Sequence, residues 1–254
     1  MKNRINIWMS LAASAAILLA TACKSETEIH AIPDNLNPMT MTPSLFTDVP
    51  EGLIEELGVE NGIPSSLCAY LVKKDGKEIL FDSGNGAENS QLIPSLGTLG
   101  VMPEDIDYVF ITHTHGDHIG GMVNDGKAVF TNATVYINKD EYEGTGFAES
   151  DMAKAYGDKM VQFTEETVLP CEIKAIKAYG HTPGHTMYRI EEVVFAGDIM
   201  HATALQLVNP ESCARFDQNK EMSAQARKDA LAAFKAEGLK VYGMHFPEPY
   251  YIQF

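Results

Sequence analysis

Between residues 110 and 119 the chain reads Phe110-Ile111-Thr112-His113-Thr114-His115-Gly116-Asp117-His118-Ile119. Three imidazoles and a carboxylate stand within six positions, directly after an apolar run that predicts a buried strand over residues 107–112. Neutral imidazole and ionised carboxylate are the ligand types that zinc and its neighbours in the first transition row prefer. A solvated surface explains one such side chain but not four together, so this stretch predicts a metal site.

The spacing of these side chains favours two metal ions. In an extended chain, residues two apart point the same way, so His113, His115 and Asp117 can converge where the strand ends. Gly116 lets the chain turn, and the turn brings in His118 from another direction. Two metal ions a few ångströms apart can hold both the attacking and the leaving oxygen of a hydrolysis.

Further ligand-type residues follow other strand-like runs. His181, Asp198 and His245 each come a few positions after a run rich in apolar residues. Because functional groups gather at the carboxyl ends of strands in open α/β sheets, we expect these side chains to join the cluster. His185 lies four residues after His181 and is an equal candidate on spacing alone.

As an ordered set, these motifs resemble the ligand series of the metallo-β-lactamase fold superfamily. The matching segments are Thr-His-Thr-His-Gly-Asp-His at 112–118, Gly-His-Thr-Pro-Gly at 180–184, Gly-Asp at 197–198, Gly-Met-His at 243–245 and Phe-Asp-Ser-Gly at 81–84. The resemblance implies an α/β fold, a four-layer αββα sandwich, with the hydrolase domain over residues 44–254.

Carried over by position, the resemblance implies two metal sites that share one carboxylate. The implied ligands are His113, His115 and His181 on the first ion, Asp117, His118 and His245 on the second, and Asp198 between them. His181 is preferred to His185 because the family's ligand directly precedes Thr-Pro-Gly. Asp82 is either a carboxylate that orients a ligand imidazole or a turn-forming residue before Ser-Gly.

Three residues are expected to take part in catalysis. Asp198 would bridge two divalent ions that share an attacking hydroxide, and Asp117 would pass a proton to the leaving group. His201 stands three residues after Asp198, where some lactonases of the superfamily have a tyrosine that faces the substrate. It therefore either contacts the substrate and donates a proton, or forms a hydrogen bond in the wall of the site.

The fold hosts many reactions, so the substrate class needs further observations. Asp198 stands where β-lactamases have Cys or Ser, which disfavours an antibiotic-cleaving enzyme. The formal net charge of −16 disfavours nucleic acid as a partner, because so acidic a surface repels phosphate backbones. The segment from Gly197 to His201 resembles the methyl parathion hydrolase-like and quorum-quenching lactonase branch.

We therefore expect a hydrolase that cleaves a small neutral ester, lactone or phosphotriester. Zinc is the expected metal, and manganese, iron and cobalt suit the same ligands. The alternatives are a glyoxalase II-like thioester hydrolase and a surface lipoprotein that retains its metals without catalysis.

The first residues predict export and lipid anchoring. Lys2 and Arg4 precede an apolar run over residues 5–20, as in a secretory signal peptide, which we expect over residues 1–22. The small residues directly before Cys23 resemble a bacterial lipobox. We expect a lipidated Cys23 on a bacterial outer membrane or a periplasm-facing membrane, followed by a polar tether over residues 23–43.

Hydrophobic patterning predicts the rest of the secondary structure. Strands are expected over residues 67–72, 78–81, 107–112, 134–137, 172–178, 188–190, 193–196 and 240–242. Helices are expected over residues 220–237, closed by Gly238, and over residues 150–162.

Overall fold

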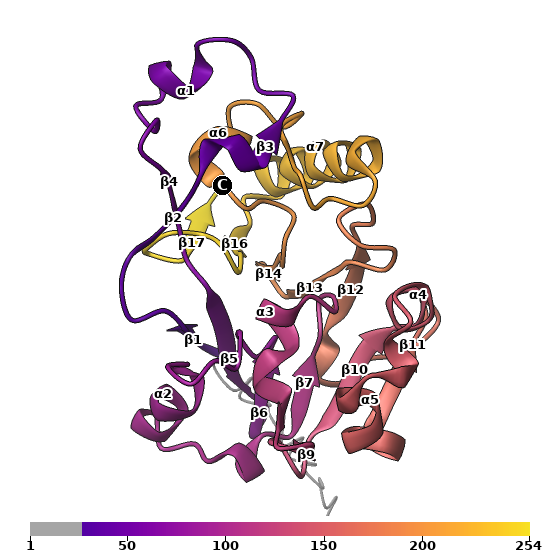
Figure 1. Cartoon of the computed structure of the whole chain (residues 1–254). Helices are drawn as coiled ribbons and strands as arrows, with labels where there is room; N and C mark the ends of the chain where they lie inside the picture. The colour runs from indigo at the N-terminus through magenta and orange to yellow at the C-terminus, as the bar shows by residue number, and fades with distance from the viewer. Residues whose placement is uncertain (1–26) are drawn as a thin grey trace, which may run out of the picture.

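Two β-sheets form the centre of the protein, of which the computed structural model describes residues 27–254 (Figure 1). In that range, the first sheet has the order β1 (Glu28–Pro33), β5 (Cys68–Lys74), β6 (Lys77–Phe81), β7 (Tyr108–Phe110), β10 (Thr134–Asn138) and β11 (Met160–Phe163). The second has the order β12 (Lys174–Lys177), β13 (Thr186–Ile190), β14 (Val193–Phe195), β16 (Lys240–Tyr242) and β17 (Tyr251–Gln253).

Alternating side chains along the strands decide which faces of the sheets meet. In β5, Tyr70 and Val72 belong to the core between the sheets, whereas Leu71 belongs to the core on the opposite face. Across the two sheets, Phe81 stacks on Phe195 with ring centroids 4.0 Å apart. The inner faces are therefore joined by a largely aromatic core.

Helices cover both outer faces of this sandwich (Figure 1). On the first sheet, α2 (Leu92–Thr98) and α5 (Asp151–Tyr156) contribute residues such as Leu96 and Met152 to one core. On the second sheet, α7 (Lys220–Glu237) buries Leu231 and Phe234 in another. This arrangement confirms the four-layer αββα sandwich.

Helix α7 forms over the predicted residues for the predicted reasons. The Asn219 side chain accepts a hydrogen bond from the Met222 amide at its start, and Gly238 ends it at a φ of 65°.

The helix predicted over residues 150–162 is too long. Ser150 does cap its start by accepting a hydrogen bond from the Ala153 amide, but α5 ends at Tyr156, and Gly157 follows at a φ of 47°. Residues Met160–Phe163 instead form β11, which pairs in parallel with β10. This segment pairs with the edge of the sheet because the pairing places Phe163 in the core between the two sheets.

The tether predicted over residues 23–43 is corrected from residue 28 onward. Residues Glu28–Pro33 form β1, which pairs antiparallel with β5, and β2 (Met39–Met41) pairs with β4 (Ile63–Ser65). The segment is polar, and its composition alone does not indicate a strand. It forms one because pairing with the buried strand β5 satisfies its backbone hydrogen-bonding groups. The predicted signal peptide and Cys23 lie outside the described residues. Within residues 27–254, the structure contains no helix with the length and apolar character needed to span a membrane.

Short elements complete the described chain. They are β3 (Phe46–Thr47), α1 (Leu53–Glu56), α3 (Gly116–Ile119), β8 (Val123–Asn124), β9 (Lys127–Ala128), α4 (Lys139–Gly144), α6 (Thr203–Gln206), β15 (Cys213–Ala214) and six 3-10 turns, at Pro43–Leu45, Pro103–Asp105, Gly120–Met122, Phe147–Glu149, Gly157–Lys159 and Pro170–Glu172. The β3–β15 pair and α6 enclose a fourth apolar core that includes Phe46 and Leu205.

Candidate metal centre

The predicted ligands come from loops that follow strands running in the same direction. In the first sheet, β6, β7 and β10 are parallel, so the loops after them leave one edge of the sheet. In the second sheet, β14 and β16 are parallel, and the loops after them carry Asp198 and His245. His181 follows β12, which runs in the same direction as β14 because both are antiparallel to β13.

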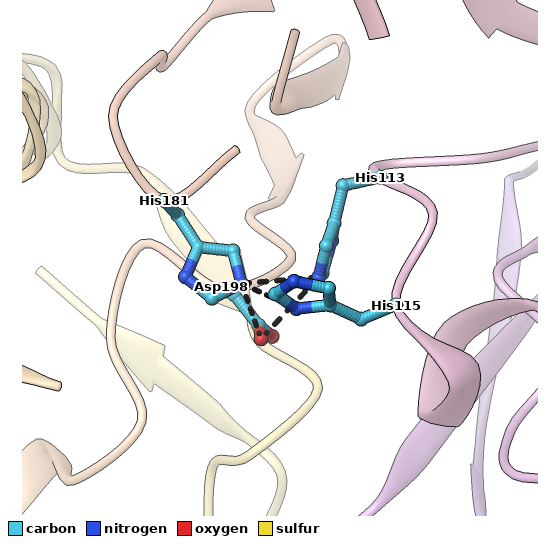
Figure 2. A group of neighbouring side chains, drawn as sticks. All are labelled: His113, His115, His181 and Asp198. Atoms are coloured by element: carbon cyan, nitrogen blue, oxygen red, sulfur yellow. Dashed lines mark hydrogen bonds and ion pairs between the residues drawn. The ribbon is translucent and has the colours of Figure 1, made fainter. Parts of the chain in front are cut away.

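Four of the predicted ligands converge on one point (Figure 2). The Nε2 atom of His181 lies 3.1 Å from Nε2 of His113 and 3.0 Å from Nδ1 of His115. The Oδ2 atom of Asp198 lies 3.2 Å from His181 Nε2 and 3.6 Å from His113 Nε2. Tetrahedral zinc with bonds of about 2.0 Å separates its ligand atoms by about 3.3 Å, so this set fits a zinc ion.

Asp117, His118 and His245 form the second set. The Nε2 atom of His245 lies 3.5 Å from Oδ2 of Asp117. The other oxygen of Asp198, Oδ1, lies 3.0 Å from His118 Nε2 and 3.3 Å from His245 Nε2. Asp198 therefore presents one oxygen to each set, which is the position predicted for a bridging carboxylate.

Three of the ligand imidazoles donate their other ring N–H to a protein oxygen. The pairs are His118 Nδ1 with Asp82 at 2.7 Å, His181 Nδ1 with Asp217 at 2.8 Å, and His245 Nδ1 with the backbone carbonyl of Ser66 at 2.9 Å. Because that nitrogen carries the proton, Nε2 of each ring keeps its lone pair directed at the centre. Asp82 thus orients the imidazole of His118, which is the first of the two roles predicted for it.

Three of the six buried side-chain atoms without hydrogen-bond partners in the described residues belong to this cluster. They are His118 Nε2, Asp198 Oδ1 and His201 Nδ1, and the first two face one another. Buried polar atoms are ordinarily paired, so unpaired ligand atoms that face one another are suited to a cation. The residues present therefore fit two divalent ions.

The electrostatics of the cluster are dominated by Asp198. Burial raises the pKa of Asp198, but the surrounding imidazoles, His118 and His245 first, lower this pKa well below its usual range. Burial lowers the pKa of His181, but hydrogen bonds to Asp198 and Asp217 outweigh it and raise this pKa to about 9. For His113 burial prevails, and the positive charge of His118 adds to it, so this pKa is well below its usual value.

His185 lies outside both ligand sets. Its Nδ1 donates to the carbonyl of Ala178, and its Nε2 accepts the backbone N–H of Asp198 at 2.9 Å. Burial lowers the pKa of His185 to about 3, so the ring is neutral. Both ring nitrogens are occupied, and His185 holds the backbone of Asp198 in place.

His201 lies next to the cluster and is wholly buried. Its Nε2 is 3.0 Å from Oδ2 of Asp198, and the edge-to-face ring of Phe216 is 4.8 Å away between centroids. Burial lowers the pKa of His201 to about 4. Asp117 is the more accessible group, with 35% of its side chain exposed.

Sequence reasoning missed two polar residues that support the predicted ligands. They are Asp217, which holds His181, and Glu141, which contacts two ligand loops. Each lies in a segment without a metal-ligand pattern, and no local signal distinguishes it from an ordinary surface residue. Arg227, which belongs to the segments that resemble the lactonase branch, lies 3.6 Å from Asp217.

The protein belongs to the metallo-beta-lactamase superfamily. The family model matches residues 68–238, well over half of the chain, and includes all the ligand loops except that of His245.

Curated relatives match part of the chain. An N-acyl homoserine lactonase of Bacillus cereus is 28% identical over 108 residues, which cover 41% of this chain and 40% of the relative. A ribonuclease Z of Ligilactobacillus salivarius (strain UCC118) is 30% identical over 165 residues, which cover 58% of this chain and 50% of the relative. The chain thus spans half or less of the length of these two relatives.

Two solved structures match nearly the whole chain. The hydrolase AbOPH of the beta-lactamase superfamily has a TM-score of 0.80 and 27% identity, with 90% of each chain covered. AidC, a dizinc quorum-quenching lactonase in complex with a product, has a TM-score of 0.79 and 23% identity, with 91% of each chain covered. At that identity, the likeness to AidC concerns the fold.

Proposed function

We propose that this protein is a dinuclear metal-dependent hydrolase that cleaves a small neutral ester, lactone or phosphotriester. The observation that carries the proposal is the Asp198 carboxylate. Its Oδ1 faces His118 and His245, and its Oδ2 faces His113 and His181. A carboxylate with one oxygen on each of two ligand sets suits a pair of cations rather than a single one.

The exposure of Asp117 and His201 indicates different roles for these two residues in the proposed reaction. Two divalent ions, which we propose to be zinc, would activate a water molecule and polarise the reacting carbonyl or phosphoryl group. Asp117 is exposed enough to exchange a proton with a leaving group beside it. His201 is wholly buried and bonded to Asp198, which favours the hydrogen-bonding role over direct contact with the substrate.

Two features support a neutral substrate. Phe216 is 40% exposed, and its ring packs at 4.8 Å from His201 and 6.0 Å from His181, which places an apolar surface beside the ligands. The net charge of −16 opposes the approach of polyanions. One of the similar solved structures is a dizinc lactonase, which supports a lactone as a member of the proposed substrate class.

The decisive experiment combines metal analysis with a substrate panel. Purified protein is assayed for bound zinc, manganese, iron and cobalt, then against lactones, aryl esters, phosphotriesters, thioesters, a chromogenic cephalosporin and a structured RNA. We expect two divalent ions per chain and turnover of a neutral ester, lactone or phosphotriester. Exclusive turnover of thioesters or RNA would overturn the substrate class, and bound metal without any turnover would favour the non-catalytic alternative.

We also propose that Cys23 carries a lipid that anchors the protein to a bacterial membrane. The support is the charged and apolar pattern before Cys23. Expression in a bacterium that processes lipoproteins should yield a membrane-bound form whose mass includes acyl chains. Replacement Cys23→Ser should abolish the added acyl mass, and acyl chains retained on this variant would refute lipidation at Cys23.

A further inference from the structure

Glu141 is a fully buried carboxylate that belongs to neither ligand set, with 0% of its surface exposed. It lies on α4, directly after β10, at the same sheet edge as the loop that follows β7. The Asn138 side chain accepts a hydrogen bond from the Asp140 amide and so begins the helix one turn before Glu141. The position of this carboxylate is therefore determined by the first sheet.

Each oxygen of Glu141 accepts two hydrogen bonds from a different loop. Oε1 accepts from the backbone N–H and the hydroxyl of Thr114, both at 2.8 Å. Oε2 accepts from the hydroxyl of Thr182 at 2.6 Å and from the backbone N–H of Gly184 at 2.9 Å. A carboxylate that accepts four hydrogen bonds in a buried setting holds its partners firmly.

The partners of Glu141 stand beside the ligands of the first metal site. Thr114 lies between His113 and His115, and Thr182 directly follows His181. Glu141 thus connects the two loops that supply all three imidazoles of this site. The ligands specific to the second site, Asp117, His118 and His245, are not adjacent to its hydrogen-bond partners in the chain.

The glycines around this contact allow the close approach. A Cβ atom on Gly184 would lie 2.1 Å from the backbone nitrogen of Glu141, and one on Gly144 would lie 2.8 Å from Cβ of Pro183. The Thr-Pro-Gly motif after His181 therefore forms the surface on which α4 packs. This contact accounts for the motif residues that bind no metal.

We propose that Glu141 is a positioning residue that clamps these two loops and preorganises the three-imidazole site. The clamp requires a carboxylate. The backbone N–H groups of Thr114 and Gly184 can only donate, and each faces a different oxygen. A glutamine would turn its NH₂ group against one of them in either orientation, which leaves a buried donor unpaired. This inference rests on the proposed metal centre and is independent of the substrate.

The test compares Glu141→Gln with Glu143→Gln in the full-length protein. Glu143 lies on the same helix, but its side chain is exposed and forms an ion pair with Lys139, at 3.7 Å. Stepwise zinc affinities of the metal-free proteins are measured by competition with a chromophoric chelator, and circular dichroism checks the fold. We expect Glu141→Gln to weaken one of the two stepwise constants by about 10- to 100-fold, as for other residues that orient metal ligands. The other constant, and both constants of Glu143→Gln, should stay at the wild-type value.

A second variant keeps the test decisive if Glu141→Gln does not fold. Thr182→Val preserves the side-chain shape and removes one of the four hydrogen bonds, so it should weaken the same zinc constant by a smaller factor. Combined with Glu141→Gln, it should add less than its separate effect, because both changes act on one network. Unchanged zinc constants in either folded variant would overturn the clamp. A wild-type protein that does not bind two ions would instead refute the proposed function.

Discussion

The imidazole of His181 donates its Nδ1 proton to Asp217, with 2.8 Å between the two atoms and both side chains buried. The second oxygen of Asp217 accepts the backbone N–H of Ala214 at 2.9 Å and lies 3.6 Å from the guanidinium of Arg227. The predicted ligand His181 is thus held by Asp217 from another loop, and Asp217 in turn lies beside Arg227 of helix α7.

The first prediction concerns this carboxylate. Replacement Asp217→Ala removes the acceptor that sets the His181 tautomer, so zinc affinity should fall by about 10- to 100-fold. Chelator competition measures the change, and Asp229→Ala, at an exposed position on α7, is the control. Wild-type zinc affinity in Asp217→Ala would show that the hydrogen bond to Asp217 does not orient His181.

The second prediction concerns Arg227, which is wholly buried and donates to the carbonyls of Ile199, Pro210 and Ser212. Replacement Arg227→Met removes the side-chain donor to the buried carbonyls of Ile199 and Pro210 and takes away the guanidinium beside Asp217. The free energy of unfolding of the metal-free protein should fall by about 3 kcal/mol, the scale for breaking a buried ion pair.

Urea denaturation followed by circular dichroism measures this loss. Arg227→Lys should recover little of it, because a single ammonium group cannot reach carbonyls on several sides. A change below about 1 kcal/mol in Arg227→Met would contradict the assigned role.

The third prediction concerns the shared carboxylate. Replacement Asp198→Ala removes a ligand from both sets, so activity should fall by more than the about 100-fold typical of residues that only orient ligands. Metal analysis should show fewer than two ions per chain, with the circular dichroism spectrum retained. Full activity in this variant would refute the bridging role.

The fourth prediction concerns the pH dependence of zinc binding. Without metal, the pKa of His181 is about 9, and the pKa values of His118 and His245 are raised by Asp198 against the effect of burial. At pH 7 the His181 ring therefore holds a proton that zinc must displace, so zinc affinity should increase as the pH rises toward 9. Calorimetric titration at pH 7 in buffers of different ionisation enthalpy should report net proton release. Heats that do not depend on the buffer would contradict this expectation.

The same pKa shift predicts the sign of a stability change in the metal-free protein. The folded pKa of His181 lies above its usual value of 6.5, so the stabilisation from its protonated form is fully present below pH 6.5. It should be lost as the pH rises to about 9. Thermal unfolding across this range measures the effect, and Asp217→Ala should reduce it.

Local patterns predicted the regular core well. The strand predicted over residues 107–112 forms over Tyr108–Phe110, and the helix Lys220–Glu237 has its predicted bounds. The failures occur where pairing between distant segments decides the structure. Residues 28–33 and 160–163 join sheet edges because β5 and β10 offer unpaired backbone groups there. The composition of these segments, polar in one and compatible with a helix in the other, does not indicate which strand they will pair with.

The sequence by itself determined which side chains are candidate metal ligands, because imidazole and carboxylate groups and their spacing are properties of residue type and of a short stretch such as 113–118. Only the tertiary structure decided how each ligand is held. It places His181 rather than His185 against His113 and gives one oxygen of Asp198 to each set. It also brings Asp217 and Glu141 to the ligand loops. The physical reason is that an orienting carboxylate acts through a hydrogen bond about 3 Å long, which the fold can supply from any segment of the chain.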